Sequence, residues 1–319
     1  MIFMYVCNKI YILLDFLTKE HKTMKKETKK TIFYRIFDWL LNLILIACGG
    51  IIVWLLIIIT TFSSFKVPTG SMEPAILPGD YILVNKWLTG ARIFDVWESA
   101  AGKEVEISRL PGIRKIKRND VVVFNDPYYR SKDSISMDIK RYYVKRCIAL
   151  PGDTFEIRQG INKVRGMEET LGNIERQRIL PHTFMPTKGW QEKGVFPQDT
   201  LLKWSLLEFG PLYLPAQGDE IAMNRKHHSL YKHLIEWEQK EKLTLKGDSV
   251  WLGDSLIQSY RFQENYYFVA GVRVTSSRDS RYWGLLPEPY IVGVASLIWK
   301  SVGTETGKVR WKRVMKTIE

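Results

Sequence analysis

The chain has 319 residues, of which 45% are hydrophobic and 13% aromatic, so it can bury a core and a wholly disordered protein is excluded. This length allows one large domain or two modest ones. The formal charge of +13 would suit a nucleic-acid-binding protein, but no nucleic-acid-binding motif accompanies it. The three cysteines are too few for a disulfide framework, and no Cys/His cluster indicates zinc. We therefore expect no nucleic-acid partner, no metal and no cofactor.

The N-terminal region combines a basic segment, residues 1–38, with a long apolar run. Residues 1–35 contain eight Lys/Arg and three Asp/Glu, a net charge of 8 − 3 = +5. No charged residue occurs between Trp39 and Phe65, and about 20 apolar residues cross the hydrocarbon core of a bilayer. A cleaved signal peptide is the rival interpretation, but the run is too long and no small-residue cleavage site follows it. We predict a transmembrane helix over residues 39–62, a lipid bilayer as partner, a cytoplasmic N-terminus and everything beyond residue 62 outside the cytoplasm.

The first 23 residues have two interpretations. Met24 precedes two lysines and resembles a natural start, in which case residues 1–23 would be an over-called extension. Alternatively, they form a weak first anchor, because their apolar run is short and is broken by Lys9 and Asp15. Both interpretations leave the basic segment inside and the main body outside.

The remainder of the chain has the pattern of a mainly β protein with mostly antiparallel pairing. Short apolar runs bounded by Gly-Asp turns predict a β-rich core over residues 63–158 and 246–319. Residues 159–245 differ, because they are rich in proline and contain one helical pattern, and we interpret them as an inserted subdomain. The expected strands are residues 81–84, 121–124, 142–149, 154–158, 216–222, 250–252, 256–260, 266–270, 290–299 and 309–311. Of these, residues 216–222 fall in the insertion, as does the helix expected over residues 226–242.

The stretch Lys66–Pro74 follows the apolar run closely and contains a candidate nucleophile, Ser71. Pro68 and Pro74 restrict the backbone on both sides of the serine, and Gly70 permits a close approach beside it. Such a loop could present one hydroxyl in a fixed direction. The alternative is a juxtamembrane linker in which Ser71 caps a short helix.

Lys145 is the candidate base, because no histidine flanks a serine motif. In a strand over residues 142–149, Tyr143, Lys145 and Cys147 share one face. Burial on that face would lower the lysine pKa from its usual ~10.4, and a base working near neutrality needs a decrease of about 3. The alternative is a lysine that extends its ammonium into solvent from an edge strand.

The stretch Gly271–Gly284 contains polar residues that could support such a lysine. Ser276 or Ser277 could orient the amine by hydrogen bonding, and Asp279 and Arg281 could pair with each other or with Arg146. The alternative is a polar surface loop whose exposed ion pair contributes little to stability.

Four motifs in order resemble those of bacterial type I signal peptidases. Residues 68–86 read Pro-Thr-Gly-Ser-Met-Glu-Pro and then Leu-Pro-Gly-Asp-Tyr-Ile-Leu-Val-Asn-Lys, which is similar to the serine motif of that family. The other three are Arg-Asn-Asp-Val-Val-Val-Phe at 118–124, Tyr-Val-Lys-Arg-Cys-Ile-Ala-Leu-Pro-Gly-Asp at 143–153 and Asp-Ser-Arg-Tyr-Trp-Gly at 279–284. Each motif alone is weak, whereas four in order are specific. The long insertion resembles that of Gram-negative members.

The resemblance implies a Ser/Lys endopeptidase of the bacterial inner membrane, with its catalytic domain on the periplasmic side. It would remove N-terminal signal peptides from exported pre-proteins after small residues at −1 and −3. Ser71 would be the nucleophile and Lys145 the general base, with the Thr69 hydroxyl and the Ser71 backbone N–H as the oxyanion hole. The implied supporting residues are Ser277, which would orient the lysine, and the salt-bridge network of Arg146, Asp279 and Arg281.

One segment departs from the family pattern. Residues 271–277 read Gly-Val-Arg-Val-Thr-Ser-Ser, so that Val272 stands where the family usually has an acid. A catalytically impaired paralogue that acts as a membrane-anchored binding or assembly module is therefore the alternative function. The joint presence of Thr69, Ser71 and Lys145 favours the peptidase. A self-cleaving Ser/Lys regulator is less favoured, because the chain has the predicted span and no DNA-binding segment.

Overall fold

The computed structural model describes residues 32–318 except 102, 104, 129–130, 132–133, 184–193 and 200. By their contacts, the residues fall into two units, Met1–Ile57 and Ile58–Glu319. Most of the predicted basic segment, including the possible start at Met24, lies outside the described residues.

The first described element is helix α2, Ile32–Thr61. Large apolar side chains along it are exposed, among them Trp39, Leu43, Ile46 and Trp54. Among the described residues, no helix is both long enough and apolar enough to cross a membrane. The span over residues 39–62 stays a prediction.

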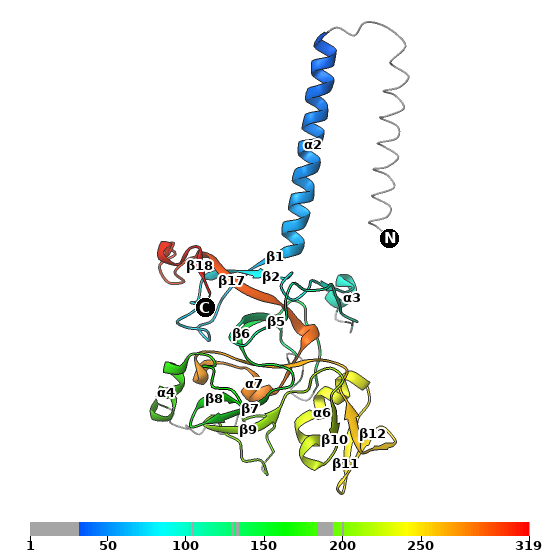
Figure 1. The fold of residues 1–319 in the computed structure, drawn as a ribbon. Helices are drawn as coiled ribbons and strands as arrows, with labels where there is room; N and C mark the ends of the chain where they lie inside the picture. The colour runs from blue at the N-terminus through cyan, green and yellow to red at the C-terminus, as the bar shows by residue number, and fades with distance from the viewer. Residues whose placement is uncertain are drawn as a thin grey trace. The chain divides into compact units, whose positions relative to one another are not determined.

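An antiparallel sheet of eight strands forms the centre of the second unit (Figure 1). Its path runs β1, β2, β17, β5, β6, β15 and β16, and β18 pairs with β17. The mainly β prediction is confirmed, as are the strands expected over residues 81–84, 121–124, 142–149, 266–270 and 290–299. The observed bounds are β1 Phe62–Lys66, β2 Asp80–Asn85, β5 Val121–Asn125, β6 Tyr142–Ala149, β15 Tyr266–Ala270, β16 Leu286–Pro287, β17 Ile291–Ser301 and β18 Lys316–Thr317.

This sheet separates two apolar cores, which explains why its central strands contain long runs of buried residues. All five residues of β5 are buried. Because side chains alternate along a strand, Val122 and Phe124 enter the larger core, whereas Val121 and Val123 enter a smaller one. Lys145 of β6 lies opposite Val122 in the register of the two strands. Strand β6 therefore lies in the middle of the sheet between β5 and β15, and its pairing with β15 ends at Arg146, next to the lysine.

The larger core is shared with a second group of strands and helices. Strand β7 (Thr154–Arg158) pairs with β8 (Ile161–Val164) and β9 (Glu208–Tyr213), so a strand of the predicted core pairs with two strands of the predicted insertion. The other elements of this region are α4 Ile174–Thr183, β10 Glu220–Ala222, α6 Arg225–Gln239, β11 Leu243–Lys246, β12 Ser249–Leu252, β13 Ser255–Ile257 and β14 Ser259–Arg261. Strand β10 pairs with β14, and β11, β12 and β13 form one sheet.

Helix α6 confirms the amphipathic helix expected over residues 226–242. The Asn224 side chain accepts a hydrogen bond from the backbone N–H of His227 and caps the helix start. Its buried face carries Leu230, Tyr231, Leu234 and Ile235 at helical spacing.

Short elements complete the fold, and one prediction among them is wrong. They are β3 Arg92–Ile93, α3 Val96–Ala100, β4 Ser108–Arg109, α7 Ser280–Trp283 and the 3-10 turns Val274–Ser276, Glu288–Tyr290 and Trp311–Arg313. Residues 309–311 do not form the expected strand. Val309 makes only an isolated bridge to Val302, and the chain then turns so that Arg310 and Arg313 both contact Asp80.

Three aromatic rings join the central sheet to the β7–β8–β9 sheet. The ring of Phe268 lies 4.1 Å from that of Phe155 and 5.7 Å from that of Phe209, centroid to centroid. We expect Phe268→Ala to lower the free energy of unfolding by about 3–5 kcal/mol, because it leaves a cavity where the two sheets meet. Urea unfolding of the purified protein measures this change.

The control is Leu256→Ala in β13, where the side chain is 53% exposed. It should change the free energy of unfolding by less than about 1 kcal/mol. Equal losses for both variants would contradict the shared core.

Candidate active site

Ser71 lies in a closed loop, residues 67–79, between β1 and β2. Two backbone hydrogen bonds close its base: Val67 N–H donates to the Asp80 carbonyl over 2.8 Å, and Gly79 N–H donates to the Val67 carbonyl over 2.8 Å. Residues 71–75 form turns, and no helix begins at Ser71 in this described stretch. The alternative of a helix-capping serine is therefore wrong.

Two apolar side chains anchor the loop from inside. Met72 and Ile76 are fully buried in the smaller core. The backbone N–H of Ile76 donates to the Met72 carbonyl over 3.1 Å, which folds this part of the loop into a turn. Ser71 is thus held beside a buried residue, and only 7% of its own surface is exposed.

Lys145 reaches Ser71 from the middle of the sheet. Its Nζ donates a hydrogen bond to Ser71 Oγ over 2.7 Å. The lysine is 3% exposed, so the alternative of a side chain extending into solvent is wrong. A neutral amine in the same position could accept the serine proton over the same distance.

Burial is the main cause of the unusual basicity of Lys145. It lowers the pKa of the amine to about 8, because desolvation disfavours the charged form. Among its charged neighbours, Asp279 and Asp126 raise the pKa and Arg281 lowers it. The effects of Asp279 and Arg281 on the lysine pKa therefore have opposite signs. Desolvation is the largest cause, and the pKa is lowered.

Asp279 and Arg281 form a buried ion pair at the start of α7. Asp279 is 0% exposed, and its carboxylate accepts hydrogen bonds from Arg281 Nη2 over 2.5 Å and from Arg281 Nε over 2.8 Å. Burial raises the pKa of Asp279, but the charge and hydrogen bonds of Arg281 outweigh it, so the pKa lies below its usual value. The carboxylate also accepts from Ser277 Oγ over 2.6 Å and from the Gly271 N–H over 2.8 Å.

Two supporting residues are placed differently from the arrangement that the motifs suggest. The Ser277 hydroxyl bonds Asp279, whereas the Lys145 amine bonds Ser71. Arg146 Nη1 donates to the Asn119 carbonyl over 2.8 Å, and the Asp279 carboxylate is taken by Arg281.

The two predicted oxyanion donors differ in exposure, because Thr69 is exposed and Ser71 is buried. Thr69 is exposed, and no residue of the described chain hydrogen-bonds its hydroxyl or accepts from the Ser71 N–H. Among the described residues no cluster of His, Cys, Asp and Glu could hold a metal ion.

The departing segment 271–273 packs directly on the Ser71 loop, which the sequence did not predict. Arg273 N–H donates to the Ser71 carbonyl over 3.0 Å, and its guanidinium forms an ion pair with Glu73 at 3.0 Å. A Cβ added at Gly271 would lie 2.1 Å from Ser277 Oγ and 3.0 Å from the Ser71 carbonyl oxygen. Only a glycine fits between these two groups.

Val272, the residue in place of the usual acid, is buried in the smaller core that also contains Val67 and Met72. An apolar contact with the loop therefore occupies this position. The contact between Ser71 and Lys145 is present beside it.

Comparisons with known proteins agree with these motifs. A family model described as signal peptidase, peptidase S26, matches residues 36–300. The chain is 28% identical over 246 residues to signal peptidase I of Buchnera aphidicola subsp. Schizaphis graminum, an alignment that covers 75% of this chain and 68% of that protein. It is 27% identical over 276 residues to signal peptidase I of Haemophilus influenzae, covering 77% and 66% of the two chains.

A solved structure of signal peptidase I from Enterococcus faecalis is 19% identical, with a TM-score of 0.28, and its match covers 58% of this chain and all of that one. The family model alone spans most of the chain. The protein belongs to the signal peptidase family, peptidase S26, a family of serine endopeptidases.

Proposed function

We propose that the protein is a membrane-anchored Ser/Lys endopeptidase that removes N-terminal signal peptides from exported pre-proteins. The observation that carries the proposal is the 2.7 Å contact between Lys145 Nζ and Ser71 Oγ, made by a lysine whose burial lowers its pKa to about 8. A serine is a weak nucleophile until an adjacent base removes its proton, and this lysine is near enough and weakly basic enough to do so.

In this mechanism the neutral amine of Lys145 takes the proton of Ser71 as its oxygen attacks the scissile carbonyl. The Thr69 hydroxyl and the Ser71 N–H donate to the oxygen that becomes negatively charged. The lysine ammonium then gives its proton to the leaving amine, and a water molecule releases the acyl group by the same steps in reverse. With a pKa of about 8, about one tenth of the lysine is neutral at pH 7.

The Asp279–Arg281 ion pair helps to hold Ser71 in position. Asp279 joins Ser277, Gly271 and Arg281, and Gly271 lies against the Ser71 carbonyl. The pair thereby acts on the serine through the backbone of residue 271. We assign Ser277, Asp279 and Arg281 to positioning, and Arg146 to the support of the neighbouring Asn119 backbone.

The sequence around the apolar run supports membrane anchoring. A basic segment precedes an uncharged stretch, Trp39–Phe65, and Ser71 follows six residues later. A nucleophile so close to the anchor suits a substrate whose own apolar segment lies in the same bilayer. The active site would then lie on the periplasmic side of a bacterial inner membrane, and cleavage would follow small residues at −1 and −3.

The alternative is a catalytically impaired paralogue that binds pre-proteins or assembles with other membrane proteins. The altered segment 272–276 is the feature that favours it. The intact contact between Ser71 and Lys145 argues against it, because a binding module has no need of a buried lysine.

Removing either member of the pair tests the proposed function. We expect Ser71→Ala and Lys145→Met each to lower the cleavage rate of a synthetic pre-protein by about 1000-fold or more. Lys145→Arg should be as inactive, because a guanidinium does not give up its proton. Mass mapping of the products locates the cut and tests the preference for small residues.

The melting temperature provides the folding control for these variants. A buried lysine with a lowered pKa destabilises the folded state below its folded pKa, and this effect disappears as the pH approaches the unfolded value. Lys145→Met should therefore be at least as stable as the native chain at pH 6. Full cleavage by either single variant would exclude the mechanism.

The pH dependence of kcat/KM should follow the titration of the Lys145 amine. Because the neutral amine is the active form, we expect the rate to rise about tenfold per pH unit below pH 7 and to level off above about pH 8. A rate that stays constant between pH 6 and pH 9 would contradict a lysine base.

Gly271→Ala tests the segment that supports the serine. The added Cβ would lie 2.1 Å from Ser277 Oγ, so the neighbouring chain must move. We expect kcat to fall at least tenfold. The matched control is Gly49→Ala, where nothing lies within 4 Å, and it should leave kcat unchanged. Native activity in Gly271→Ala would show that this packing does not position the serine.

A further inference from the structure

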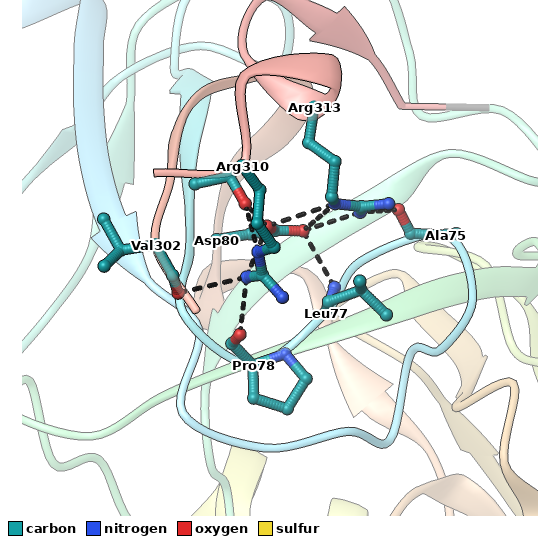
Figure 2. A network of polar contacts seen from close by, with 8 residues as sticks. Ala75, Leu77, Pro78, Asp80, Val302, Arg310 and Arg313 are labelled. Carbon is teal, nitrogen blue, oxygen red and sulfur yellow. Dashed lines mark hydrogen bonds and ion pairs between the residues drawn. The ribbon is translucent and has the colours of Figure 1, made fainter. Parts of the chain in front are cut away.

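Asp80 is the centre of a polar network at the end of the Ser71 loop (Figure 2). It is the first residue of β2 and is 0% exposed. Its carboxylate accepts from Ser301 Oγ over 2.6 Å, from Arg310 Nη2 over 3.1 Å and from Arg313 Nη2 over 2.7 Å. It also accepts from the backbone N–H of Leu77 over 2.8 Å, which fixes the turn that ends the loop.

The two arginines contact the loop backbone as well as Asp80. Arg313 Nη2 donates to the Ala75 carbonyl over 2.9 Å, and Arg310 Nη2 donates to the Pro78 carbonyl over 2.7 Å. Figure 2 shows both guanidinium groups reaching this backbone from one side. Two charged forks thus hold residues 75–80 at several points, and each fork is planar and rigid.

The same residues close the base of the loop. The Asp80 carbonyl accepts the Val67 N–H, and the Val302 N–H donates to the Gly79 carbonyl over 3.0 Å. A Cβ added at Gly79 would lie 2.0 Å from the Val302 carbonyl oxygen, so the loop and residue 302 are in direct contact. A shift of Asp80 would therefore move both ends of the segment that contains Ser71.

A second turn of identical sequence shows how much of this network a turn alone requires. Residues 77–80 and 150–153 both read Leu-Pro-Gly-Asp. In the second turn, Asp153 accepts from the Leu150 N–H over 2.8 Å and pairs with a single arginine, Arg118. Asp80 has two arginines and a serine hydroxyl in addition to the backbone bond. Of the two turns, only the one that ends the Ser71 loop has these additional hydrogen-bond donors.

The charge on Asp80 is maintained by these partners. Burial raises the pKa of its carboxyl, but hydrogen bonds from Arg313, Ser301 and the Leu77 N–H outweigh it, so the pKa lies below its usual value. The carboxylate is therefore ionised wherever the protein is folded near neutral pH. Its two cationic partners remain satisfied under the same conditions.

We propose that Asp80, Arg310 and Arg313 form a clamp that positions Ser71 against Lys145. This inference rests on the proposed Ser/Lys function. Both arginines lie outside residues 36–300, the part of the chain that the family model matches. The clamp acts through the backbone of residues 75–80, so its members are positioning residues and do not touch the substrate.

The test compares Arg313→Met with two controls in the full chain. Lys312→Ala removes an exposed neighbouring cation, and Arg118→Met removes the arginine from the second Leu-Pro-Gly-Asp turn. Steady-state cleavage of a synthetic pre-protein is measured well below each melting temperature. We expect Arg313→Met to lower kcat at least tenfold with KM within about twofold. Lys312→Ala should match the native chain, and Arg118→Met should lose stability but keep kcat within about twofold.

A triple variant separates positioning from folding. Asp80→Asn/Arg310→Met/Arg313→Met removes all three charges of the network, and so avoids leaving any of them without its partner. We expect it to melt closer to the native chain than Asp80→Asn alone does, yet to retain a loss of kcat as large as that of Arg313→Met. A triple variant whose kcat recovers together with its stability would overturn the proposal.

Hydrogen exchange gives a readout that does not depend on activity. We expect the amides of Val67 and Gly79 to exchange faster in Arg313→Met, while amides of β5 and β6 are unchanged. Unchanged exchange at Val67 and Gly79 would overturn the clamp even if the native chain cleaves pre-proteins. A native chain that cleaves no pre-protein would instead refute the proposed function, and the exchange result would still stand.

Discussion

The hydrogen bond between Lys145 and Ser71 joins residues 74 positions apart and is the contact on which the rest of the site depends. Its two partners come from different kinds of structure. The lysine belongs to a central strand between β5 and β15, whereas the serine belongs to a loop between β1 and β2. A distance of 2.7 Å can be kept only if the loop is held as firmly as the strand. The loop has accordingly a closed base, a buried Met72 and ion pairs on two sides.

Burying the lysine creates a conflict between stability and chemistry. Desolvation destabilises the ammonium, and lowering the pKa from 10.5 to about 8 corresponds to roughly 3 kcal/mol. The same desolvation makes the amine available as a base near neutral pH. The neighbouring Asp279–Arg281 pair places opposite charges close together, and their effects on the lysine pKa have opposite signs. The larger core, in which β5 and β6 pack, supplies the stability that offsets this cost.

Much of the fold followed from local sequence patterns. Apolar runs closed by Gly-Asp turns predicted β2, β5, β6, β15 and most of β17, and helical spacing predicted α6. The strand expected over residues 309–311 was wrong, because alternation cannot reveal that Arg310 and Arg313 turn towards an aspartate more than 200 positions away. Long-range polar contacts override local preference at that point.

The site residues also divide into those that the sequence could predict and those that it could not. Ser71 and Lys145 could be singled out from residue type, flanking residues and strand alternation. The partner of Ser277 could not, since it depends on how α7 begins, and the pairing of Arg273 with Glu73 joins two segments 200 positions apart. Gly271 was the one available signal, as a glycine at the start of the departing segment.

The central position of β6 has a consequence for how such a site can diverge. A lysine fixed by neighbours on both sides of its strand leaves little freedom to the base. The serine loop is held by several separate contacts, which come from residues 271–273, 301–302 and 310–313. The burial of Val272 and the Arg273–Glu73 pair are among them. The sheet thus fixes the position of Lys145, whereas the position of Ser71 depends on the segments that contact its loop.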